Sequence, residues 1–108
     1  MSLASRQCQH KPALLDTDGA SQLMAELDPG WQLGDNGKSI SRDYKFSNYY
    51  ETMAFVNVVA MIAHQQDHHP EMNVGYNHCR VEYSTHKLGG LSDYDFICAA
   101  KIDATLPL

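Results

Sequence analysis

The sequence has little positive charge and no concentration of it. Eight lysines and arginines stand against thirteen aspartates and glutamates, so the formal net charge is -5 at pH 7. The lysines and arginines are scattered and form no basic run. A nucleic-acid partner normally requires a basic face that meets the phosphates. The charge balance therefore argues against nucleic-acid binding.

Cysteine is scarce, and long apolar runs are missing. The three cysteines, Cys8, Cys79 and Cys98, are odd in number and include no C-x-x-C pair. A disulfide framework needs an even, patterned set, so we expect reduced thiols. No apolar run approaches the ~20 residues of a membrane span, and the first residues lack the apolar core of a signal peptide. We therefore expect a cytoplasmic protein with no membrane partner.

The length of the chain is enough for one domain with a single core. Of its 108 residues, 44% are hydrophobic and 19% are charged, as in ordinary globular proteins. Residues 1–12 are polar and lack periodicity, which predicts a flexible N-terminal tail. Residues 13–108 are then one domain.

Alternating hydrophobicity predicts four strands in two hairpins. The first hairpin joins residues 31–33 to 39–46 around Gly34-Asp35-Asn36-Gly37, because Asn-Gly tolerates the positive φ of a tight turn. The second joins residues 74–76 to 79–84, with Asn77-His78 at the turn. In its second strand Cys79, Val81 and Tyr83 alternate with polar residues, so one face is buried.

Helical periodicity predicts three helices around these hairpins. Thr17 or Asp18 caps a short helix that Pro29-Gly30 ends, and Ser47 or Asn48 caps the longest helix, through about residue 66. Ser92 caps the last helix. The order α-β-β-α-β-β-α predicts an α+β fold, a four-stranded antiparallel sheet with three helices on one face. The uncovered face or edge of so small a sheet favours self-association.

Histidine is the residue that the sequence concentrates. Five of the six histidines lie between His64 and His86, and two are adjacent in Asp67-His68-His69-Pro70. An unperturbed imidazole titrates near neutral pH, so such a cluster is typical of proton transfer or metal binding. Pro70 disfavours helical geometry at His69, which places the pair where the helix gives way to a loop. Because the second strand of a hairpin runs back, His86 can return toward this loop.

Each of these residues also has a purely structural interpretation. A single exposed histidine is more often solvated than catalytic, and His64 with His68, four residues apart, also fits a surface pair. Asp95 falls in the first turn of the last predicted helix, where a carboxylate stabilises the N-terminus. Tyr76 and Tyr83 fit ordinary packing on a sheet.

A zinc site is the main alternative to proton transfer as the function of these histidines. His64 and His68 at i and i+4, with His86 or Cys79, could bind zinc. No glutamate follows His64 as in H-E-x-x-H, and Cys79 alternates onto the predicted buried face of its strand. The sequence therefore favours proton transfer.

Spaced positions across the second half of the chain form one pattern: His64-x-x-x-His68-His69-Pro70, Tyr76, Ser84-Thr85-His86, Gly90-Leu91 and Asp95. This pattern resembles the signature of the pterin-4a-carbinolamine dehydratases. The resemblance spans about residues 14–103, and the ending Ala-Ala-Lys-Ile-Asp at 99–103 is similar to bacterial members.

The resemblance implies both a fold and an activity. The family has a four-stranded antiparallel sheet with three helices on one face, and it assembles as homodimers or homotetramers. Its members are hydro-lyases that eliminate water from 4a-hydroxytetrahydrobiopterin, giving quinonoid dihydropterin without a metal or an organic cofactor. The reaction recycles tetrahydropterin, so a functional link to an aromatic amino acid hydroxylase is expected.

The resemblance also implies a set of site residues. The catalytic positions are His68, His69 and His86, and the substrate-binding positions are Asp67, Ser84, Thr85, Asp95 and Met72. We predict that His68 and His86 flank C4a as acid and base, in either assignment. His69 then orients the pterin or its leaving water, and Asp95 holds His86 in one tautomer.

Two departures and two alternative functions accompany this interpretation. Met72 stands where many animal members have tryptophan, which removes an aromatic stacking partner for the pterin. His64 occupies a position often held by glutamate. The alternatives are a non-catalytic dimerisation or assembly partner, and a pterin dehydratase-like protein of molybdopterin metabolism. The intact histidine set favours the enzyme.

Overall fold

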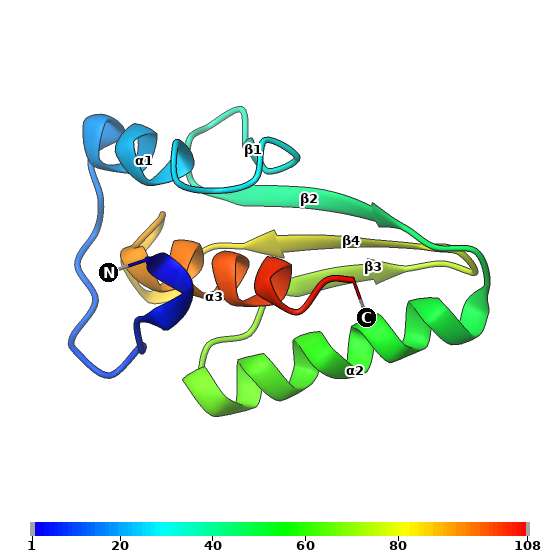
Figure 1. Cartoon of the computed structure of the whole chain (residues 1–108). Helices are drawn as coiled ribbons and strands as arrows, with labels where there is room; N and C mark the ends of the chain where they lie inside the picture. Colours follow the sequence, from blue (N-terminus) through cyan, green and yellow to red (C-terminus); the bar gives the residue numbers. More distant parts are fainter. Residues whose placement is uncertain (1, 108) are drawn as a thin grey trace.

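Four antiparallel strands and three α-helices make up the computed structural model, which describes residues 2–107 (Figure 1). The elements run α1 (Thr17–Met24), β1 (Gln32–Leu33), β2 (Ile40–Lys45), α2 (Tyr49–Gln66), β3 (Glu71–Val74), β4 (His78–Tyr83) and α3 (Asp93–Ala104). Two 3-10 helices, η1 (Leu3–Ser5) and η2 (His86–Leu88), were not expected from the sequence. The predicted α+β class and the order α-β-β-α-β-β-α are confirmed.

The sheet has the strand order β1-β2-β4-β3, so the two longest strands lie at its centre. β2 and β4 pair in antiparallel register from Ile40 opposite Tyr83 to Lys45 opposite His78. Along β4 the residues Cys79, Val81 and Tyr83 are buried while Arg80 is exposed. The predicted alternation is therefore confirmed, and only one face of the sheet faces the core.

The helices cover that buried face. Phe55, Val59 and Ile62 of α2 join the same core cluster as Phe96 and Ile102 of α3. Phe55, Val59 and Ile62 are spaced by four and three residues, which places them on one side of α2. The buried Ala99 lies midway between Phe96 and Ile102 on α3. The Asn48 side chain caps α2 by accepting a hydrogen bond from the Glu51 amide at 2.9 Å. The predicted span and cap of this helix are confirmed.

Three local details differ from the sequence prediction: the cap of α1, its end at Met24 instead of just before Pro29-Gly30, and the turn of the first hairpin. Asp16 caps α1, in place of Thr17 or Asp18, because its side chain accepts from the Gly19 amide at 2.7 Å. The loop of the first hairpin has positive φ at Gly37 alone. Asn36 instead accepts a hydrogen bond from the Lys38 amide through its side chain, at 2.9 Å.

The second hairpin is shifted relative to its prediction. β3 begins at Glu71, three residues earlier than expected, and His78 belongs to β4 rather than to the turn. Pairing of Val74 with Cys79 sets this register, and the Gly75 amide closes the turn on the His78 carbonyl at 2.9 Å. The polar residues Glu71 and Asn73 hid the strand because β3 is exposed at the sheet edge.

The N-terminal segment lies against α3 (Figure 1). Leu3 is buried at 4% exposure, and the Lys101 ammonium donates to the Ala4 carbonyl at 2.9 Å. Arg6 pairs with Asp93 at 2.8 Å. The predicted tail therefore contacts the domain. The mostly polar composition of residues 1–12 did not indicate that Leu3 would be buried. Residues 1 and 108, the limits of the predicted tail and domain, lie outside the described residues.

Among residues 2–107, no helix combines the length and hydrophobicity needed to cross a bilayer. β1 and β3 are the two edges of the sheet. Exposed edges of this kind allow pairing with a second chain, so self-association stays a prediction.

Candidate active site

The end of α2 turns His68 toward the N-terminus of α3. Asp67 takes a left-handed conformation with φ of 52°, which stops the helix. The His68 amide then donates to the Ala63 carbonyl at 3.1 Å and closes the helix end. The imidazole that follows is largely buried, with 12% of the side chain exposed.

Asp95 receives this imidazole from the first turn of α3. His68 Nε2 lies 2.6 Å from Asp95 Oδ1. The second oxygen, Oδ2, accepts from the Ser92 amide at 3.0 Å and from the Thr85 hydroxyl at 2.8 Å. Asp95 is fully buried. One carboxylate therefore caps α3 and binds a histidine that lies 27 residues earlier in the chain.

The donors around Asp95 determine which nitrogen of His68 carries a proton. An ionised carboxylate only accepts hydrogen bonds, so Nε2 of His68 must donate to it. Neutral His68 then has its lone pair on Nδ1, which can accept a proton. The negative charge of Asp95 stabilises the imidazolium that forms. The pair is arranged for proton transfer at Nδ1.

Aromatic rings fix the plane of the His68 imidazole. The Tyr83 ring stacks on it with 5.6 Å between centroids and 13° between planes. The Tyr94 ring meets it edge-on at the same centroid distance and 77°. Tyr83 is fully buried in the core, and burial raises the pKa of its hydroxyl. The imidazole is therefore held by packing as well as by Asp95.

Asp95 holds His68 and not His86, contrary to the sequence prediction. Successive side chains of an extended segment point to opposite sides. Thr85 points inward, buried and bonded to Asp95, and His86 begins η2 as an exposed residue. Within the described chain the His86 imidazole makes no hydrogen bond. The orientation of residues 85 and 86 after β4, which the sequence did not reveal, therefore places Thr85 and not His86 beside Asp95.

The other expected site residues differ in exposure and in the contacts that they make. Asp67 and His69 are exposed, with His69 Nδ1 3.4 Å from the Pro70 carbonyl. Ser84 and Met72 are half-buried. The Thr85 hydroxyl is already engaged by Asp95 and by Ser92 Oγ at 2.7 Å. Thr85 therefore supports the carboxylate, whereas a pterin-lining role would need a free hydroxyl.

Residues 2–107 do not provide the ligand set that the zinc alternative requires. No group of three or more histidine, cysteine, aspartate or glutamate side chains in that range is placed to hold a metal ion. Cys79 is fully buried on the core face of β4, and burial raises the pKa of its thiol. It is a core residue in this fold.

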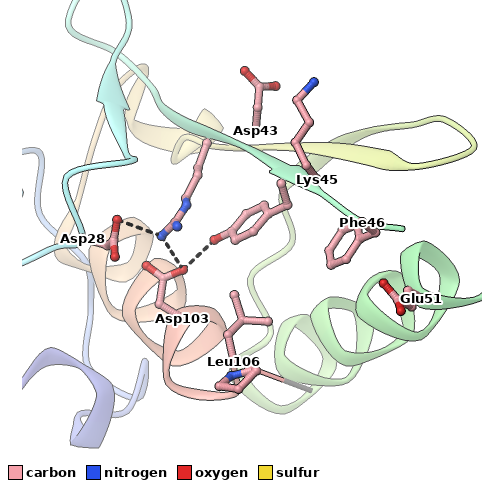
Figure 2. A pocket seen from close by; sticks show the side chains of 10 residues that line it. Asp28, Asp43, Lys45, Phe46, Glu51, Asp103 and Leu106 are labelled. Carbon is pink, nitrogen blue, oxygen red and sulfur yellow. Dashed lines mark hydrogen bonds and ion pairs between the residues drawn. The ribbon is translucent and has the colours of Figure 1, made fainter. Parts of the chain in front are cut away.

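A pocket of about 670 Å³ opens elsewhere, between β2, the start of α2 and the end of α3 (Figure 2). Asp103 lies on its wall and accepts hydrogen bonds from Arg42 at 3.1 Å, Tyr44 at 2.7 Å and Trp31 at 2.7 Å. Each of these donors is therefore satisfied within the protein, which makes the cluster structural. This cluster was not predicted from the sequence. The signal for it is an aspartate in the last turn of a helix, where a negative charge opposes the helix dipole and so needs compensating donors.

Fold and site together define a small α+β protein built around a carboxylate-held histidine. A family model described as pterin 4 alpha carbinolamine dehydratase matches residues 13–105. The chain belongs to this family. The resemblance predicted from spaced histidines is confirmed.

Individual relatives agree with this assignment. A protein of Nitrosomonas eutropha, provisionally named a pterin-4-alpha-carbinolamine dehydratase, is 57% identical over 96% of this chain and 93% of its own length. One from Xylella fastidiosa with the same provisional name is 48% identical over 96% of this chain and 91% of its own. A solved Brucella melitensis structure, described as a transcriptional coactivator/pterin dehydratase, is 32% identical, with a TM-score of 0.81 over 85% of this chain and 97% of its own.

Proposed function

We propose that this chain is a 4a-hydroxytetrahydrobiopterin dehydratase, a hydro-lyase that uses histidine acid/base catalysis. The buried 2.6 Å contact between His68 and Asp95 carries the proposal. It prepares one imidazole to take a proton, which is half of what the elimination requires. Family membership supplies the substrate class.

The reaction removes hydroxide from C4a and a proton from the adjacent ring nitrogen of the pterin. We assign the proton acceptor to His68, because Nδ1 carries the lone pair and Asp95 stabilises the resulting cation. His86 then protonates the leaving hydroxide, so that water departs. Its exposed imidazole, free of protein partners in the described chain, can carry that proton. His69 orients the pterin or the leaving water.

Pterin binding is assigned to residues near this pair. Asp67, Ser84 and Met72 are exposed or half-buried and can contact a ligand. Met72 offers a flexible, polarisable side chain to a flat ring. Asp95 and Thr85 act behind His68 and position it.

A dehydration assay on wild type and three variants tests this assignment. The substrate is generated in situ by an aromatic amino acid hydroxylase, and the rate above the uncatalysed reaction is measured. We expect His68→Ala and His86→Ala each to lower turnover at least about tenfold, as loss of a general acid or base does. His64→Ala is the matched control, because His64 is an exposed histidine one turn earlier on α2.

The outcome separates the enzyme from a binding protein. Normal turnover in His68→Ala or His86→Ala would overturn the catalytic roles. A folded wild type with no acceleration would overturn the dehydratase. That result would favour a partner-binding role of the kind named for the Brucella structure.

We also propose an oligomeric state, a location and a metabolic link for this enzyme. Homodimers or homotetramers, a cytoplasmic location and a link to an aromatic amino acid hydroxylase follow from the family resemblance. Light scattering tests the oligomeric state, cell fractionation tests the location, and turnover coupled to the hydroxylase tests the metabolic link.

A further inference from the structure

Two cysteines far apart in the sequence meet beside the candidate active site. Cys8 Sγ lies 4.0 Å from Cys98 Sγ. Cys98 is fully buried on α3, and Cys8 is half-buried in the N-terminal segment. A disulfide needs about 2.05 Å between its sulfurs. The two sulfurs are therefore about 2 Å farther apart than in a disulfide.

Several contacts hold Cys8 in this position. Its amide donates to Gln66 Oε1 at 2.8 Å, and its thiol lies 3.9 Å from the Tyr94 carbonyl oxygen. Arg6 and His10, on either side of Cys8, both contact the Asp93 carboxylate in the first turn of α3, at 2.8 and 2.7 Å. The two sulfurs face each other because the segment is attached on both sides of Cys8.

The two thiols differ in reactivity. A hydrogen bond with Cys98 lowers the pKa of the Cys8 thiol below its ordinary value. The same hydrogen bond, together with burial, raises the pKa of the Cys98 thiol. Because the thiolate is the nucleophile, and because Cys8 is the accessible partner, Cys8 reacts first.

We propose that Cys8 and Cys98 are a reversible redox pair whose disulfide fastens the N-terminal segment to α3. The oxidant is a small disulfide such as oxidised glutathione. The Cys8 thiolate attacks one glutathione sulfur, forming a mixed disulfide and releasing one glutathione thiolate. The Cys98 sulfur then attacks Cys8 Sγ, which forms the protein disulfide, while the Cys98 proton passes to the departing thiolate of the second glutathione. Two electrons pass from the cysteines to the oxidant.

The location connects this pair to the catalytic histidine. The Tyr94 carbonyl faces the Cys8 thiol, and the Tyr94 ring packs edge-on against His68. Closing the disulfide moves Cys8 relative to this residue. Cytosolic disulfides are commonly transient and redox-sensing, which suits a reversible pair of this kind.

The test is oxidation of the full-length protein by oxidised glutathione under native conditions. Free thiols are alkylated, and intact mass and peptide mapping identify the bonds. We expect wild type to form an intramolecular Cys8–Cys98 disulfide that dithiothreitol reverses. The bond should raise Tm by at least about 5 °C, since it restricts the unfolded chain.

Variants separate this pair from general thiol oxidation. Cys8→Ser removes a half-buried sulfur, so it should fold, form no disulfide and show no Tm rise on oxidation. Cys98→Ala should instead retain glutathione on Cys8. Cys79→Ala, which removes a buried cysteine of β4, should behave as wild type. Disulfide-linked dimers, or wild type that stops at the mixed disulfide on Cys8, would overturn the proposal.

Discussion

Tyr83 shows how one residue serves both the core and the site. Its ring fills the core beneath the helices and stacks on His68. Its hydroxyl is buried near the Cys98 thiol, a weak acceptor, and makes no hydrogen bond of normal geometry in the described residues. An unpaired buried hydroxyl costs free energy, because it has lost the hydrogen bonds that it makes to water. The ring therefore stabilises the protein while the hydroxyl does not.

We predict that Tyr83→Phe is at least as stable as the wild-type protein. The variant keeps the ring and removes the unpaired hydroxyl, so we expect the free energy of unfolding to stay equal or rise by about 1 kcal/mol. Urea denaturation measures it. Tyr83→Leu is the contrasting variant, because it removes the stacked ring; it should lower stability by about 1–3 kcal/mol. A loss above about 1 kcal/mol in Tyr83→Phe would mean that the hydroxyl has a partner in solution.

The end of α2 shows how an element positions the His68 side chain. Asp67 is the described non-glycine residue with positive φ, and it lies directly before His68. Left-handed geometry strains most side chains, and glycine adopts it freely. The sequence retains an aspartate there, which fits the predicted contact of its carboxylate with the pterin.

Substitutions at Asp67 therefore separate helix ending from ligand binding. Asp67→Gly should raise the free energy of unfolding by about 0.5–1 kcal/mol because it removes the strain. Asp67→Ala keeps a side chain in the left-handed region and should be less stable than Asp67→Gly by about 1 kcal/mol. If the carboxylate contacts the pterin, both variants should raise KM alike. Equal stability of the two variants would contradict the claim that the left-handed backbone at position 67 strains a side chain.

Asp103 joins three parts of the whole molecule. It lies at the end of α3 and accepts hydrogen bonds from Arg42 and Tyr44 of β2 (Figure 2). It also accepts a hydrogen bond from Trp31, which precedes β1. Burial and the hydrogen bond to Asp103 raise the pKa of the Tyr44 hydroxyl, so it stays a donor. The far end of α3 is thereby attached to the sheet while its first turn holds the histidine.

We predict that Asp103→Ala lowers the free energy of unfolding by about 3 kcal/mol. The substitution leaves the buried Trp31 and Tyr44 donors without their acceptor. Arg42 keeps its pair with Asp28 at 3.2 Å. Thermal and urea denaturation measure the loss. Asp35→Ala is the control, since Asp35 is exposed in the first hairpin loop and should change stability by less than about 0.5 kcal/mol. A similar loss in both variants would contradict the role of Asp103.

Local patterns predicted the elements well and the turns less well. The helix from Asn48 to Gln66 and the alternation of β4 follow from residue periodicity, which depends only on neighbours in the chain. The shift of β3 was missed because strand register depends on the facing strand. Leu3 was missed because a single apolar residue creates no period.

The sequence by itself determined the order of elements, the family and the histidines that carry the candidate chemistry. These depend on residue types and their spacing along one chain. The tertiary structure alone decided that Asp95 holds His68, that Thr85 supports the carboxylate, and that Cys8 meets Cys98. Those contacts join residues brought together by strand register and by the docking of α3 and the N-terminal segment, and no local pattern encodes where such surfaces meet.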